Sequence, residues 1–168
     1  MQFKTSLILL LLSSNLFALN SDRQKPYHFS SNQATYLKHS RHTVLSGNAI
    51  ITQGSSELTG DTITLIQNSQ THKLEQVIAK GQRATFSTLP DGQTTKMHAK
   101  AGTIIFYPTT NKVILKTQAR TNQNGQILSS NVLNYDANTN IVTTPSQPSG
   151  KKTTIIIPPQ LNTQRVKP

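Results

Sequence analysis

Apolar and polar residues alternate in short runs over most of the chain, and polar turn sequences separate these runs. The turns include GSS at 54, LPDGQTT at 89 and DANTN at 136, between segments rich in Val, Ile and Thr. Alternation with a period of two is typical of β-strands, and no long stretch in the body of the chain has the 3.6-residue apolar period of a helix. Short turns favour antiparallel neighbours, because parallel strands need long crossover connections. The pattern therefore predicts an all-β fold of stacked antiparallel strands.

Two strand patterns repeat along this region. The first is [LA]-x-[GAS]-x-x-[IL]-x-[LFY], found in LTGDTITL (58–65), AKAGTIIF (99–106) and LSSNVLNY (128–135), with a looser match in FSSNQATY (29–36). The second precedes each of the three, as VLSGNA from Val44, IAKGQR from Ile78 and ILKTQA from Ile114. Successive copies of the second pattern start 34 and 36 residues apart. This spacing is typical of a stacked β-repeat, in which each unit contributes one strand of each kind.

The first pattern contains a step that ordinary alternation does not explain. Its small residue and the next apolar residue are three positions apart, as with Gly60 and Ile63, whereas one strand face repeats every two residues. A local bulge or bend would bring both to the inner face, and the small side chain would let the backbones approach there. The alternative is that these residues only fill a core. Ile50 and Ile51 are adjacent and both apolar, so their faces stay undecided.

The start of the chain has a different composition. One Lys at position 4 precedes an apolar run from Leu7 to Leu12 and then small and polar residues up to Ala18. This order predicts a secretory signal peptide, since the run is far short of the ~20 residues that a membrane-spanning helix needs. We expect a signal peptide at residues 1–18, a mobile segment at 19–26, one β-domain at 27–158 and a mobile tail at 159–168.

Charge and composition narrow the classes of partner. The chain carries 17 basic and 6 acidic residues, and the excess of positive charge favours anionic partners. Because the basic residues are spread along the sequence, they are either a solvated surface or a rim that attracts phosphates and acidic sugars. The absence of Trp and the few aromatic residues argue against a nucleic-acid platform, and no cysteine is present for disulfide or thiol chemistry.

No constellation for catalysis or metal binding is evident. His39 and His42 are close in sequence but lie between predicted strands rather than on a helix. The acidic residues are scattered, and the chain contains no Gly-x-Ser-x-Gly, HExxH or Walker sequence. We therefore expect a protein that is not an enzyme, with no catalytic residues, no metal and no cofactor.

Several segments resemble, in order, the motifs of the OstA-like family of periplasmic lipopolysaccharide-transport proteins. They are KPYHFSSNQATYL, LSGNAIITQG, KGQRATF, AKAGTIIFY and KKTTIIIPPQL, which together span about residues 25 to 161. Where the family commonly has an "AD" step, this chain has GD at Gly60, AG at Ala101 and SN at Ser130. The resemblance implies an open, twisted β-jellyroll with an apolar interior groove, an OstA-like domain at 27–158.

The resemblance also implies a function and partners. The protein would bind lipopolysaccharide, shield its lipid A acyl chains, and pass it from an inner-membrane transport complex with a bitopic OstA-like subunit to the N-terminal jellyroll domain of an outer-membrane translocon. An alternative is an envelope scaffold whose β-domain has a filled core, binds proteins and carries no lipid.

The repeat positions and the matched motifs indicate which side chains line the groove. The expected lipid-binding residues are Tyr27, Phe29, Ile63, Leu65, Phe86, Ile104, Phe106, Leu133 and Tyr135.

The two ends of the repeat array are expected to be strand edges without a partner inside the chain, and therefore to join molecules head to tail. These edge residues are Tyr27, His28, Phe29 and Ser30 at one end, and Thr153, Thr154, Ile155, Ile156 and Ile157 at the other.

Overall fold

The computed structural model describes residues 22–146 and 151–159. The expected signal peptide and residues 160–168 of the expected tail lie outside these ranges. A short 3₁₀ helix, η1 (Asp22–Gln24), precedes ten strands. Their bounds are β1 (His28–Ser30), β2 (Gln33–Leu37), β3 (His42–Gln53), β4 (Ser56–Gln67), β5 (Leu74–Thr88), β6 (Met97–Tyr107), β7 (Lys112–Gln123), β8 (Gln126–Asp136), β9 (Ile141–Thr143) and β10 (Thr154–Ile156).

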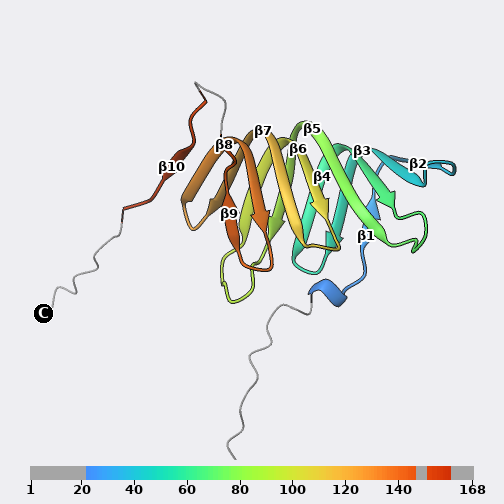
Figure 1. The fold of residues 1–168 in the computed structure, drawn as a ribbon, viewed down its shortest axis with the longest axis horizontal. Coiled ribbons are helices and arrows are strands. Elements are labelled where there is room, and N and C mark those ends of the chain that lie inside the picture. Colours follow the sequence, from blue (N-terminus) through green and yellow to red (C-terminus); the bar gives the residue numbers. More distant parts are fainter. Residues whose placement is uncertain (1–21, 147–150, 160–168) are drawn as a thin grey trace, which may run out of the picture.

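All ten strands form one antiparallel sheet in the order β1-β3-β4-β5-β6-β7-β8-β10, with β2 also beside β3 and β9 also beside β8 (Figure 1). The six long strands follow one another as hairpin neighbours, as the short turns predict. The second repeat pattern lies on β3, β5 and β7, and the first on β4, β6 and β8. The predicted all-β fold of stacked antiparallel strands is confirmed.

The long strands all bend at the same level of the sheet. Register shifts occur in each of the five pairings between them, at Ser46/Ala49, Thr59/Thr62, Lys80/Ala84, Lys100/Thr103 and Lys116/Ala119. Bulges bend a strand and increase its local twist, so this row of bulges forms a crease that folds the sheet into two walls. The bulge expected between Gly60 and Ile63 is part of this crease.

We call the two halves wall A and wall B. Wall A contains residues 42–46, 62–67, 74–80, 103–107, 112–116 and 132–136. Wall B contains residues 49–53, 56–60, 84–88, 97–101, 119–123 and 126–130. Every turn between consecutive long strands lies at the far edge of one wall, so the turns line an open side opposite the crease, which we call the mouth.

The inner faces of the two walls pack against each other as one hydrophobic core. Ile63, Ile104 and Leu133, the same position in three repeats, are 0% exposed beside the crease. Farther from the crease, Phe86 of wall B and Tyr135 of wall A bring their ring centroids within 6.5 Å. Ile51 belongs to this core at 5% exposure while Ile50 is 37% exposed on the other face, which settles the orientation that the sequence left undecided.

The ends of the sheet differ from the expectation. Strands β1 and β10 were predicted to have no partner within the chain, but β1 pairs with β3 through His28↔Thr52 and β10 pairs with β8 through Thr154↔Ser129. Strands β1 and β10 pair only with the half of the neighbouring strand that belongs to wall B, whereas β2 and β9 pair with the half that belongs to wall A. The outer backbone edges of these four short strands have no partner among the described strands.

Candidate binding groove

A cavity lies between the walls at the mouth. Its apolar lining comes from both walls and from the segment before β1: Tyr27, Ile51, Leu58, Val77, Phe86, Phe106, Val113 and Tyr135. Its free volume is about 80 Å³, whereas pockets for small molecules hold roughly 300–1,000 Å³. In this conformation the walls are therefore closed on each other, and an acyl chain can enter only if they separate.

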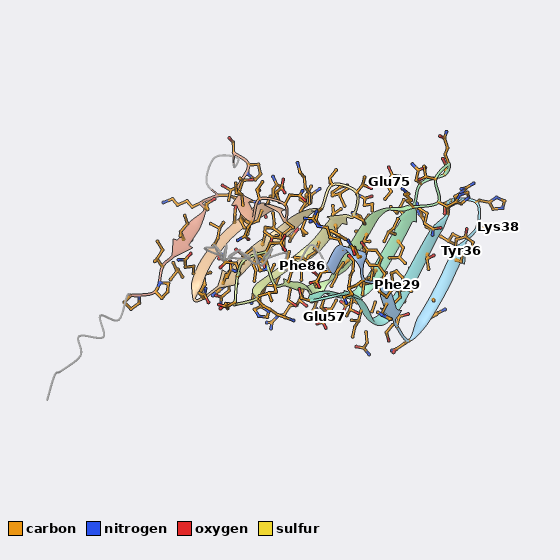
Figure 2. The ribbon with its side chains drawn as sticks, turned by 90° about the horizontal axis from the view of Figure 1, so that it is seen from below. Phe29, Tyr36, Lys38, Glu57, Glu75 and Phe86 are labelled. Atoms are coloured by element: carbon orange, nitrogen blue, oxygen red, sulfur yellow. The ribbon has the colours of Figure 1, made fainter. Side chains whose placement is uncertain are left out.

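The structure divides the expected lining residues into three groups. Ile63, Ile104 and Leu133, with Leu65, are packed in the core and do not reach the cavity. Tyr27, Phe86, Phe106 and Tyr135 line the cavity itself. Phe29 is 45% exposed on β1, where its ring stacks on Tyr27 with centroids 6.2 Å apart. Figure 2 shows Phe86 within the body of the stack and Phe29 toward its β1–β2 end.

Among the lining residues that sequence reasoning missed are four apolar side chains on the long strands. Ile51, Val77 and Val113 come from strands of the second repeat pattern, and Leu58 is the first position of the first pattern. The signal was present, because Val77 and Val113 lie two residues before the buried Ala79 and Leu115. Simple alternation on the odd-numbered long strands would therefore have placed them on the inner face.

Residues 22–25, which we call the strap, lie across the mouth. At wall B, the Ser55 backbone N–H donates to Asp22 Oδ2 over 2.8 Å, and Gln53 Nε2 donates to the carbonyls of Arg23 and Lys25 over 3.2 and 3.1 Å. At wall A, the Asn111 amide oxygen, in the orientation that satisfies its neighbours, accepts from Arg23 Nη2 and Nε over 2.8 and 3.1 Å. The strap therefore connects the two walls, although it falls within the segment expected to be mobile.

Two phenols at the mouth have shifted pKa values. Burial, followed by the nearby negative charges of Asp91 and Asp136, raises the pKa of Tyr135 to about 12. Burial also raises the pKa of Tyr27, partly opposed by its hydrogen bond with Gln53. Both phenols are thus neutral at physiological pH, as suits side chains that face an apolar cavity.

Large exposed apolar side chains lie at the two ends of the stack. At one end they are Phe29, Tyr36, Leu37 and Ile50, and at the other Ile141, Ile155, Ile156 and Ile157. Monomeric proteins rarely leave such residues grouped without a partner. Both sets of residues expected to form edges thus lie in or beside strands at the ends of the sheet, where each strand pairs on its inner side and leaves its outer edge without a partner among the described strands.

The described parts of the chain contain no group of three or more His, Cys, Asp or Glu side chains positioned for a metal ion. No helix within these parts is long and apolar enough to cross a membrane.

Comparison with known proteins assigns the chain to a family. The family model described as "LptA/(LptD N-terminal domain) LPS transport protein" matches residues 28–141. The lipopolysaccharide export system protein LptH of Pseudomonas aeruginosa is 33% identical over 132 residues, which cover 77% of this chain and 74% of LptH. LptA of Escherichia coli K12, also named as a lipopolysaccharide export system protein, is 31% identical over 109 residues, or 59% of each chain.

A solved structure agrees with this assignment. The crystal structure of LptH, described as the LptA-homologous periplasmic component of the lipopolysaccharide transport device of Pseudomonas aeruginosa, matches with a TM-score of 0.75 and 28% identity, over 83% of this chain and 99% of that one. The resemblance drawn from the sequence motifs is confirmed, and a transport family agrees with the expectation of a protein that is not an enzyme. The chain belongs to the LptA/(LptD N-terminal domain) family of LPS transport proteins.

Proposed function

We propose that the protein is a periplasmic bridge component that binds lipopolysaccharide through its acyl chains and passes it toward the outer membrane. The observation that carries this proposal is the continuous apolar inner surface, to which both walls contribute along the whole array of long strands. Family membership supplies the cargo class. We place the lipopolysaccharide-binding domain at residues 27–158. The strap precedes this domain, and an export signal at residues 1–18 precedes the strap.

The physical need for such a surface follows from the cargo. Leaving about ten methylenes of an acyl chain in water costs on the order of 8 kcal/mol. An apolar surface removes this cost without directional bonds, so the cargo is shielded but free to move along it. No side chain needs to react with the cargo, and no metal or cofactor is required for this role.

Cargo entry requires the walls to part about the crease. The residues packed deepest, Ile63, Ile104 and Leu133, would hold the crease together while the side chains near the mouth exchange their mutual contacts for contacts with acyl chains. We therefore assign acyl contact to Tyr27, Phe86, Phe106 and Tyr135 in the first instance, with Leu65 behind them. Phe29 would instead contact cargo where it crosses from one molecule to the next.

The ends of the stack are proposed to join other molecules. A strand from a second copy, from the inner-membrane complex or from the outer-membrane translocon would pair with the unpaired edge of β1 and β2 or of β9 and β10. The exposed Ile155, Ile156 and Ile157 would be covered by such a contact. An arrangement of this kind is heterologous, because one end binds the other, and it extends into an open chain of molecules.

Photo-crosslinking tests the groove. A photoreactive amino acid at Phe86 or Phe106 should capture lipopolysaccharide, whereas the same group at Gln82, an exposed residue at the crease opposite the mouth, should not. Capture at Gln82 with none at Phe86 or Phe106 would contradict the assignment.

The scaffold alternative makes a different prediction. A β-domain with a permanently filled core would carry no lipid, in agreement with the closed walls, but would still bind proteins at its ends. Purification without detergent, followed by analysis for bound lipopolysaccharide, separates the two functions: lipid that copurifies in a fixed ratio to protein excludes the scaffold.

A further inference from the structure

Pairing of the strands brings together basic residues that are far apart in the sequence. Lys100 of β6 is directly opposite Arg120 of β7, and Arg120 is opposite Ser129 of β8. Ser129 is in turn opposite Thr154 of β10, which follows Lys151 and Lys152. All four basic residues are exposed. Lys100 and Arg120 alternate with buried inner-face residues, so their side chains lie on the outer face of wall B.

These side chains surround a hollow of about 450 Å³, which we call the basic hollow. Lys100, Arg120, Lys151 and Lys152 all line it, together with hydrogen-bonding side chains that include Ser129 and Asn131. Within the described part of the chain, no carboxylate lines it. The hollow adjoins the crease, on the side of the sheet away from the mouth, so it does not form part of the groove.

The like charges are not neutralised by the protein itself. Like charges directly opposite each other on neighbouring strands destabilise a sheet. One carboxylate, Glu57 of β4, lines an adjoining hollow with Lys100 and Arg120, but among the described residues the ion pair that forms is Lys112 with Asp136, elsewhere on the sheet. An anion in the basic hollow would offset the repulsion between Lys100 and Arg120.

We propose that the basic hollow is a binding site for phosphate groups. The planar Arg120 guanidinium can donate two parallel hydrogen bonds to phosphate oxygens, while the lysines supply positive charge. Ser129 and Asn131 add uncharged donors. A phosphate group has more acceptor oxygens than a carboxylate and can carry a second negative charge, which matches four cations better than an acidic side chain does.

The test is a titration of the mature chain with sodium pyrophosphate at fixed ionic strength, followed by calorimetry. The double variant Lys100→Gln, Arg120→Gln should lose on the order of tenfold in affinity. Its matched control is Lys38→Gln, Lys96→Gln, which removes the same charge from an exposed turn and an exposed loop and should bind pyrophosphate like the wild type. Because Lys100 and Arg120 repel each other, their double variant should also be at least as stable to urea as the wild type.

A second arm identifies the source of the phosphate. A lipid headgroup is indicated if the wild type and the control variant cosediment with phosphatidylglycerol vesicles but not with phosphatidylcholine vesicles, and the Lys100→Gln, Arg120→Gln variant cosediments with neither. Binding of pyrophosphate with no cosedimentation on either kind of vesicle indicates a soluble phosphate compound. The proposal is overturned if the wild type binds neither, or if both double variants lose the same affinity. Pyrophosphate has no acyl chain, so this result does not depend on whether the groove carries lipid.

Discussion

Releasing the strap should speed entry of cargo into the groove. The strap is held by the Asp22 carboxylate, by the carbonyls of Arg23 and Lys25, and by the Arg23 side chain. Fixing four residues costs about 1–2 kcal/mol per residue in backbone entropy. Hydrogen bonds contribute about 0.5–1.5 kcal/mol each, and more when one partner is charged. The entropy cost and the hydrogen-bond contributions nearly cancel, so the closed position of the strap is favoured by only a small free energy.

The substitution Asp22→Ala removes the charge-assisted bond to the Ser55 amide. A loss of about 1–2 kcal/mol corresponds to a roughly 5- to 30-fold shift toward the open strap. We expect the association rate of a fluorescent acyl probe, measured by stopped flow, to rise by up to this factor. Gln24→Ala, at an exposed position of η1, is the control and should not change the rate. Gly54→Ala should act like Asp22→Ala, because a Cβ at Gly54 would overlap the Asp22 carboxylate.

Closing the strap permanently should have the opposite effect on the association rate of the acyl probe. The chain has no cysteine of its own, so Asp22→Cys with Ser55→Cys introduces one disulfide that ties the strap to wall B. The oxidised variant should take up the probe more slowly than the wild type, and the reduced variant faster. If the oxidised variant and the wild type associate at the same rate, cargo does not pass the strap and this interpretation is wrong.

Three other predictions follow from the described residues. Ile156→Asp, or deletion from Thr153 onward, should weaken self-association in light scattering across a concentration series while the β-domain stays folded; a wild type that is monomeric throughout would contradict the edge assignment. Thr117 has φ +69° at the crease, a conformation costly for a β-branched residue, so Thr117→Gly should raise the free energy of unfolding in urea by about 1 kcal/mol, whereas Lys116→Gly beside it should lower that free energy. The raised pKa of Tyr135 favours the protonated phenol in the folded state. The contribution of this phenol to stability is therefore complete below about pH 10 and is lost as the pH rises toward 12. Tyr135→Phe should remove this loss of stability at high pH, and an unchanged loss in the variant would show that Tyr135 does not cause it.

The sequence predicted those parts of the fold that repeat. The three-residue step from Gly60 to Ile63 indicated the bulge. The same step elsewhere predicted that Ile104 and Leu133 face inward as groove-lining residues, whereas the structure packs them in the core. Alternation could not separate residues that pack at the crease from residues that face the cavity, because both are inward and apolar. That distinction depends on distance from the mouth, which is a property of the folded walls.

The remaining features depend on contacts between distant segments. The strap is polar in sequence and resembles a mobile segment, yet Ser55 and Asn111 hold it. Strand β9 has only three residues, and the burial pattern of an edge strand is too weak to indicate it. Lys100 and Arg120 are twenty positions apart, so their proximity becomes evident only from the register of β6 and β7.

The crease has a consequence for how proteins of this kind can change in length. Because each strand contributes to both walls, an internal duplication of one unit of 34 to 36 residues inserts two strands and alters neither end. Neighbouring strands are about 4.8 Å apart, so such a duplication would lengthen the groove by about 9.6 Å. The distance spanned by one molecule is therefore open to stepwise evolution by gene duplication, and a designer can set it in the same increments.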